Sequence, residues 1–206
     1  MEQRSEEWFQ ARLGKVTASR IADLMARTKS GYSTSRANYM AELIAERLTG
    51  KKGDSYQNAA MQWGTEQEPA ARAAYETLKG VLVEEVGFVP HPIIPNAGAS
   101  PDGLVNDDGL VEIKAPFTAT HLDFLTTGDV PEKYILQMQW QMACTGRRWC
   151  DYVSFDPRLP ERMAIHMFRV FRDDATIHKI ETEVQTFLSE LDSKLFNLIK
   201  MFPEEK

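Results

Sequence analysis

The sequence lacks the features that mark membrane proteins and disulfide-bonded secreted proteins. No apolar run approaches the roughly 18 residues of a membrane-spanning helix. The first ten residues, MEQRSEEWFQ, contain no apolar segment typical of a secretory signal peptide. The two cysteines, Cys144 and Cys150, match no metal-binding spacing and need not pair. We therefore expect a reduced protein that lies in the cytoplasm and does not associate with a membrane.

Other absences weigh against particular kinds of chemistry. The sequence contains no glycine-rich phosphate loop, so nothing indicates that the protein uses ATP. The four histidines show no spacing typical of zinc ligands. The formal net charge of −6 by itself argues against binding to nucleic acid.

The charge is unevenly distributed along the chain. Residues 1–52 contain ten basic and six acidic side chains, a net charge of +4. The remainder contains 14 basic and 24 acidic side chains, a net charge of −10. A basic N-terminal portion could hold a polyanion, and an acidic body could hold a metal cation. Random variation of surface charge explains the same distribution equally well.

The pattern of apolar residues predicts an α/β fold. Helical spacing predicts helices within residues 5–15, 16–26, 35–50, 56–80, 132–146 and 173–201. Strands are expected within residues 81–89, 99–105, 110–116, 149–155 and 163–171. This order predicts a mixed central β-sheet flanked by helices. With no linker or internal repeat, we expect one domain: N-terminal helices over about 1–57, an α/β core over about 58–172 and a C-terminal helix over about 173–201.

Capping residues predict where several helices begin and end. Ser5 precedes the first predicted helix and is a favoured N-cap residue. Gly50 and Gly80 are expected to end the third and fourth helices, because glycine readily adopts the left-handed conformation. Gly64 lies inside the fourth predicted helix and is expected to break or kink it.

Charged residues interrupt the otherwise apolar strand LVEIKAP. Residues two apart in a strand point to the same face, so Glu112 and Lys114 lie side by side, opposite Val111 and Ile113. Asp102 lies on the preceding extended segment, so its carboxylate can converge with that of Glu112. Two such carboxylates suit Mg²⁺, which can activate water and neutralise charge on a phosphate. Lys114 could orient the attacking water or stabilise an anionic transition state. The alternative is an exposed edge strand with a simple Glu–Lys pair.

The order Asp102, gap, Glu112, Lys114 resembles the signature of the PD-(D/E)xK nuclease superfamily. The rest of the chain resembles one branch of it, the lambda exonuclease or YqaJ-type viral recombinase family. The matching blocks, in family order, are WFQARLGKVTASRIADLM, QWGTEQEPAAR, SPDG, VEIKAPF and YILQMQWQM. The resemblance implies a restriction-endonuclease-like core with an N-terminal helical region. Pro69 departs from the pattern, because it follows the expected acid and predicts a fresh helix start.

The resemblance also implies roles for individual residues. Glu68 stands where the family acid contacts a metal or its water, and Gln139 where the family glutamine supports the site. For Glu68, the alternative is a solvated carboxylate on a helix. For Gln139, the alternative is a buried glutamine that only bonds the backbone. The implied catalytic set is Asp102, Glu112, Lys114, Glu68 and Gln139, and the implied metal-binding set is Asp102, Glu112, Ile113 and Glu68.

A second implied group recognises the DNA end. Arg12, Ser19 and Ser100 match positions that the family uses to hold a 5′-terminal phosphate. An arginine and two hydroxyls suit that ligand, although a surface arginine and two capping residues would look the same. Met61 is assigned as a wedge at the DNA end.

These correspondences imply a Mg²⁺-dependent exonuclease, with Mn²⁺ as a substitute. It would degrade one strand of linear double-stranded DNA from 5′ to 3′ and leave a 3′ tail for recombination. The family implies a ring-shaped homotrimer, a single-strand annealing protein as partner, and a phage or prophage gene expressed in a bacterial host. Two alternatives remain open: a structure-specific or restriction-type endonuclease of the same superfamily, and a catalytically silent DNA-binding module.

Overall fold

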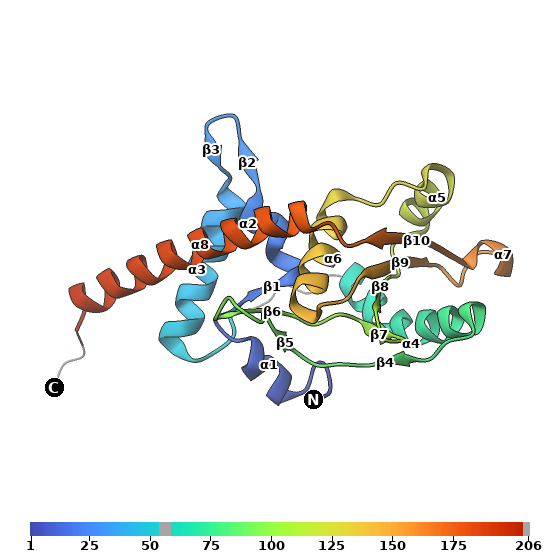
Figure 1. Cartoon of the computed structure of the whole chain (residues 1–206), viewed down its shortest axis with the longest axis horizontal. Coiled ribbons are helices and arrows are strands. Elements are labelled where there is room, and N and C mark those ends of the chain that lie inside the picture. The colour runs from blue at the N-terminus through green and yellow to red at the C-terminus, as the bar shows by residue number, and fades with distance from the viewer. Residues whose placement is uncertain (54–58, 204–206) are drawn as a thin grey trace.

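A five-stranded sheet forms the centre of the molecule in the computed structural model, which describes residues 1–53 and 59–203 (Figure 1). Its strand order is β10–β9–β8–β7–β4, and β8 and β9 run parallel while the other neighbours are antiparallel. The strands are β4 (Val83–Glu84), β7 (Gly103–Val105), β8 (Gly109–Lys114), β9 (Trp149–Phe155) and β10 (Ile165–Phe171). The expected mixed sheet flanked by helices is confirmed.

Two smaller sheets accompany the central one. The first has the order β1–β6–β5 and the second is a hairpin of β2 and β3, which projects from the body (Figure 1). These strands are β1 (Val16–Thr17), β2 (Arg27–Thr28), β3 (Gly31–Tyr32), β5 (Val89–Pro90) and β6 (Ala97–Ala99). The segment 81–89, expected as one strand, is therefore divided between two sheets.

The helices follow the predicted order, with two further helices that were not predicted, at Thr118–Thr127 and Glu161–Ala164. They are α1 (Glu6–Arg12), α2 (Ile21–Met25), α3 (Thr34–Thr49), α4 (Ala59–Lys79), α5 (Thr118–Thr127), α6 (Glu132–Thr145), α7 (Glu161–Ala164) and α8 (Asp174–Met201), with a short 3₁₀ turn at Ala18–Arg20. The hydroxyl of Ser5 accepts a hydrogen bond from the backbone N–H of Trp8, as its N-cap role predicts. Gly50 ends α3 in the left-handed conformation, also as predicted.

Helix α4 departs from the prediction. It runs without interruption from Ala59 to Lys79, so the expected break at Gly64 and the fresh start at Pro69 are both wrong. Packing explains this continuity, because Ala71 and Tyr75 of α4 are fully buried against the central sheet. Gly80 follows the helix with φ +64°, as expected for its end.

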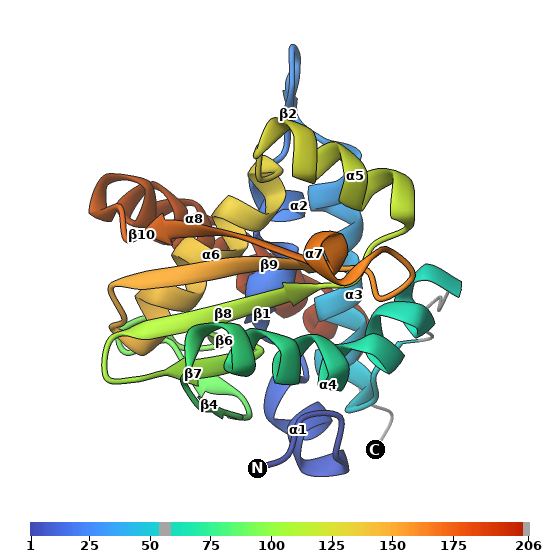
Figure 2. The same ribbon diagram turned by 90° about the vertical axis from the view of Figure 1, so that its right-hand side faces the viewer.

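The central sheet is covered on both faces, by α4 on one side and α6 on the other (Figure 2). Val111 and Ile113 of β8 pack in the same cluster as α4. Leu110 of the same strand packs with Met138 and Met142 of α6. The alternation along β8 therefore directs Glu112 to the α6 side, as the sequence pattern predicts.

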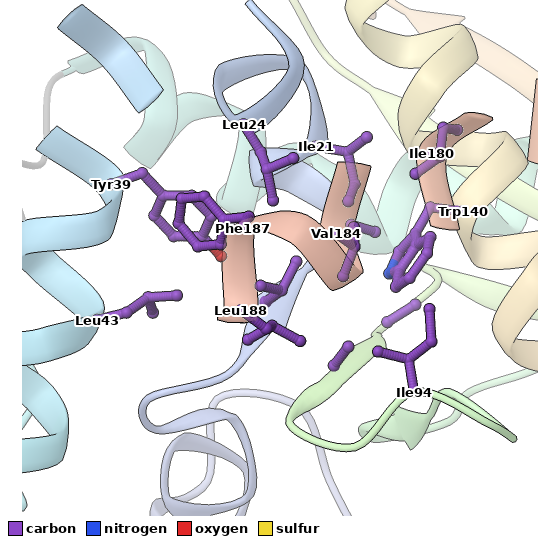
Figure 3. Packing of buried hydrophobic residues seen from close by; sticks show 14 of the residues in the cluster. Ile21, Leu24, Tyr39, Leu43, Ile94, Trp140, Ile180, Val184, Phe187 and Leu188 are labelled. Carbon is purple, nitrogen blue, oxygen red and sulfur yellow. The ribbon is translucent and has the colours of Figure 1, made fainter. Parts of the chain in front are cut away.

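A second core joins the N-terminal helices to α6 and α8. Tyr39 of α3 stacks on Phe187 of α8 with ring centroids 5.5 Å apart, and Ile21, Trp140 and other buried side chains surround them (Figure 3). The N-terminal segment is thus packed against the rest of the chain. The domain limits themselves stay a prediction. No helix in the described part of the chain is long and apolar enough to cross a bilayer.

Candidate active site

The β7–β8 hairpin brings Asp102 to the strand that carries Glu112. Asp102 immediately precedes β7, whose Gly103 pairs with Val111 of β8. The Oδ2 atom of Asp102 accepts a hydrogen bond of 2.7 Å from the backbone N–H of Ile113. The structure therefore places Asp102 close enough to Glu112 that the negative charge of Glu112 contributes to raising the pKa of Asp102.

Glu112 is fully buried and is held by three donors. Lys114 Nζ and Gln137 Nε2 both donate to its Oε1 atom, the latter over 2.7 Å. Gln141 Nε2 donates to Oε2 over 2.6 Å. A buried carboxylate is costly unless it is paired and hydrogen-bonded, and these donors meet that requirement.

Lys114 remains a cation in this surrounding. Burial alone lowers the pKa of its ammonium group, but Glu112 and Asp102 outweigh burial and raise the pKa above its ordinary value. Its Nζ also lies 5.1 Å from the ring centre of Tyr134, a favourable cation–π contact. In the absence of a metal, Lys114 therefore carries a positive charge and can stabilise an anion.

The carboxyl of Asp102 has the opposite tendency. Burial, and then the negative charge of Glu112, raise the pKa of Asp102 from 3.8 to about 8. In the metal-free protein this carboxyl is protonated at neutral pH. A bound cation would favour the ionised form, so metal binding is linked to release of a proton.

This raised pKa predicts how the stability of the metal-free protein depends on pH. The unfolded chain releases the Asp102 proton near its ordinary pKa of 3.8, whereas the folded chain keeps it up to about pH 8. Unfolding thus releases a proton in this window, and the free energy of unfolding falls as pH rises from about 4 to about 8. Denaturant titrations in EDTA should show this slope, and Asp102→Asn should flatten it. Parallel slopes for the two proteins would contradict the assignment.

Glu68 lies on α4 and contributes to the same electrostatic field. Its negative charge is among the causes that raise the pKa of Asp102. Its carboxylate is paired with Arg4 over 2.6 Å and with Arg72 over 3.1 Å, and its side chain is only 15% exposed. Glu68 is therefore not a solvated helix carboxylate.

The donor chemistry of this group fits a hard divalent cation. Asp102 and Glu112 supply carboxylate oxygens, and their mutual repulsion is what a cation would relieve. Within residues 1–53 and 59–203, no three His, Cys, Asp or Glu side chains are already arranged as a metal site. Each oxygen of Glu68 accepts one arginine N–H, Oε2 from Arg4 and Oε1 from Arg72.

Gln139 requires a correction. Its Nε2 donates to the carbonyl of Phe171 over 2.8 Å, and its Oε1 accepts from the backbone N–H of Asp173 over 2.9 Å. It therefore joins α6 to the β10–α8 connection and does not contact Glu112. Gln137 and Gln141 make that contact, because residues four apart on a helix share a face, whereas residues two apart do not.

A second group of side chains surrounds Ser100, two residues before Asp102. The hydroxyl oxygen of Ser100 accepts one hydrogen bond from Arg12 Nη1 and one from Trp8 Nε1, each 2.9 Å long. The guanidinium of Arg12 lies 4.2 Å from the ring centre of Trp8. With both acceptor positions of its oxygen used, Ser100 can donate its own hydrogen to an anion.

The environment of Arg12 keeps it cationic. Burial lowers the pKa of Arg12 to about 10, still well above neutral pH. Arg12 lines a cavity of about 320 Å³ together with Ser19 and Met61. Ser19 is exposed, and Met61 is 56% exposed. The structure thus brings Arg12, Ser19 and Met61 to one cavity, and Arg12 connects that cavity to Ser100.

Sequence reasoning did not assign site roles to Trp8, Gln137 or Gln141. The spacing showed only which of these residues share a helix face. Trp8 precedes Arg12 by four residues on α1, and Gln137 precedes Gln141 by four on α6, so each pair shares one helix face.

Comparisons with known proteins found a matching family model and similar solved structures. Residues 7–148 match the model of the YqaJ-like viral recombinase domain. The chain is 56% identical to LHK-Exo, an alkaline exonuclease from Laribacter hongkongensis, over 96% of this chain and 97% of that one. The TM-score with the crystal structure of LHK-Exo is 0.89, and with that of its complex with dAMP it is 0.90.

More distant proteins share the fold or part of the sequence. A phage related exonuclease from Haemophilus somnus 129PT has 15% identity and a TM-score of 0.71 over 89% of this chain and 96% of its own, which shows a likeness of fold. Uncharacterized protein R354 of Acanthamoeba polyphaga mimivirus is 25% identical over 169 residues. That match covers 74% of this chain but only 29% of the viral protein.

Proposed function

Because this chain belongs to the YqaJ-like viral recombinase family, we propose that it is a metal-dependent exonuclease that degrades linear double-stranded DNA. The observation that carries the proposal is the group formed by the buried Glu112 with the partly buried Asp102 and Lys114, in a chain 56% identical to an alkaline exonuclease. Phosphodiester hydrolysis requires charge neutralisation and an activated water, and this group suits both.

The chain's own residues would divide the work as follows. Asp102 and Glu112 would hold Mg²⁺, for which Mn²⁺ could substitute, and the main chain of Ile113 and the carboxylate of Glu68 would complete the metal site. When bound, the ion would supply a water of lowered pKa and neutralise charge on the phosphate. The ammonium of Lys114, held beside Glu112, stabilises the negative charge that develops on the phosphate oxygens.

The direction of digestion follows from the second group. We assign Arg12, Ser19 and Ser100 to the 5′-terminal phosphate and Met61 to the separation of the end base pair. An end held there would be cut at the neighbouring carboxylates, because Ser100 is only two residues from Asp102. Digestion would then run from 5′ to 3′ and leave a 3′ single-stranded tail for strand annealing.

The assembly and partners are proposed on the same family ground. A ring-shaped homotrimer could enclose DNA in a local basic channel despite the net charge of −6. A single-strand annealing protein would receive the 3′ tail. The gene would be of phage or prophage origin and act in the cytoplasm of a bacterial host.

One assay separates this function from its alternatives. Linear duplex and covalently closed circular duplex of the same sequence are incubated with the protein in Mg²⁺ or in EDTA. We expect only the linear DNA to be lost, and only with Mg²⁺. Cutting of the closed circle would indicate an endonuclease, and binding without cutting would indicate a silent DNA-binding module.

A further inference from the structure

The two glutamines that hold Glu112 are not equivalent. Both lie on one face of α6, one helical turn apart, and each donates from its Nε2 atom to a different oxygen of the carboxylate. Gln137 shares Oε1 with Lys114, whereas Gln141 bonds Oε2. Gln141 is also fully buried, while Gln137 is partly exposed.

Counting acceptor positions distinguishes the two oxygens of Glu112. An ionised carboxylate offers about two lone-pair directions on each oxygen. Oε1 already accepts from Lys114 and Gln137, so both of its directions are used. Oε2 accepts from Gln141 over 2.6 Å, which leaves one direction open. The open position of Glu112 is therefore on the oxygen that Gln141 holds.

The amide of Gln141 has one tolerable orientation. Turning it over would place its Oε1 atom against the carboxylate of Glu112 in a buried site, which is electrostatically unfavourable. In the orientation observed, Oε1 is itself buried without a hydrogen-bond partner in the described part of the chain. A buried carbonyl oxygen without a hydrogen-bond partner costs free energy. The amide of Gln141 nevertheless keeps the orientation in which its Nε2 donates to Glu112.

We propose that Gln141 is a positioning residue that fixes Oε2 of Glu112 as the oxygen through which this carboxylate holds the metal. The inference rests on the proposed metal-dependent function. It assigns Gln141 no contact with DNA or with the reacting atoms. Residues that orient a metal ligand typically contribute 10- to 100-fold to metal affinity.

The test compares buried glutamines of the same helix. Gln141→Met removes the donor at similar volume, and Gln141→Asn keeps an amide that is one methylene too short to reach Glu112. Gln139→Met is the matched control, because Gln139 is buried on α6 but bonds only the backbone at Phe171 and Asp173. Mn²⁺ binding to each protein is measured by calorimetry without DNA, and the Mg²⁺ concentration for half-maximal cleavage is measured separately.

We expect both Gln141 variants to bind Mn²⁺ about 10- to 100-fold more weakly than wild type and to need correspondingly more Mg²⁺. Gln139→Met should lose thermal stability without a change in metal affinity. Unchanged Mn²⁺ affinity in folded Gln141 variants would overturn the inference, as would failure of both to fold, since Gln141 would then serve the fold alone. Absence of Mn²⁺ binding and cleavage in the wild type would instead refute the proposed function.

Discussion

Asp102→Asn is expected to abolish DNA cleavage and, in the same protein, to raise the stability of the metal-free state. Cleavage should fall by about 1,000-fold or more, because a metal-binding carboxylate supports several kcal/mol of transition-state stabilisation. The amide carries no charge, so it avoids the cost of placing a second anion beside Glu112. At pH 8 in EDTA, the free energy of unfolding should rise by about 1–3 kcal/mol.

The opposite signs of these two effects make the test specific. The carbonyl oxygen of an asparagine can still accept the hydrogen bond from the backbone N–H of Ile113, so the hairpin is expected to keep its structure. Asp107→Asn, in the exposed turn between β7 and β8, is the matched control and should change neither quantity. Near-normal cleavage by purified Asp102→Asn would remove Asp102 from the site.

Arg12→Ala is expected to remove the preference for 5′-phosphorylated ends. A guanidinium–phosphate pair is charge-assisted and can be bidentate, so its loss should cost about 1.5–3 kcal/mol of binding, or about 10- to 150-fold. Ends with a 5′-hydroxyl lack the recognised group and should be slowed much less. Arg12→Lys should recover only part of the preference, because an ammonium is a point charge.

Arg20 provides the control for a general loss of positive charge. It lines the same cavity but is already paired with Asp23 and Glu42. Arg20→Ala should therefore slow phosphorylated and hydroxylated ends to the same extent. The ratio of the two digestion rates is the quantity to compare among wild type, Arg12→Ala and Arg20→Ala. A ratio that Arg12→Ala leaves unchanged would remove Arg12 from the phosphate pocket.

Local signals in the sequence were sufficient for most elements. The caps at Ser5 and Gly50 depend on neighbouring residues alone, and both are confirmed. The alternation in LVEIKAP likewise predicts the two faces of β8, because strand geometry fixes where successive side chains point. Helix α5 was not predicted, and its N-cap residue, Phe117, makes no capping hydrogen bond by its side chain.

Features that depend on distant contacts could not be predicted in this way. The glutamines of YILQMQWQM stand at every second position, and only the packing of α6 on the sheet decides that Gln137 and Gln141 face Glu112 while Gln139 faces the β10–α8 connection. Helix α4 continues through Gly64 and Pro69 because Ala71 and Tyr75 in its C-terminal half are buried against the sheet. In helix α4, tertiary packing thus overrides local propensity.

The order in which labels at the 5′ and 3′ termini of one strand are released tests the central claim most directly. Linear duplex with 5′-phosphates is labelled at either the 5′ or the 3′ terminus of one strand and incubated with the protein and Mg²⁺. A metal-dependent 5′-to-3′ exonuclease should release the 5′ label at once as a mononucleotide, while the 3′ label stays on a long single strand. EDTA should prevent the release of the 5′ label. Release of the 3′ label first, or of both labels on internal fragments, would contradict the account.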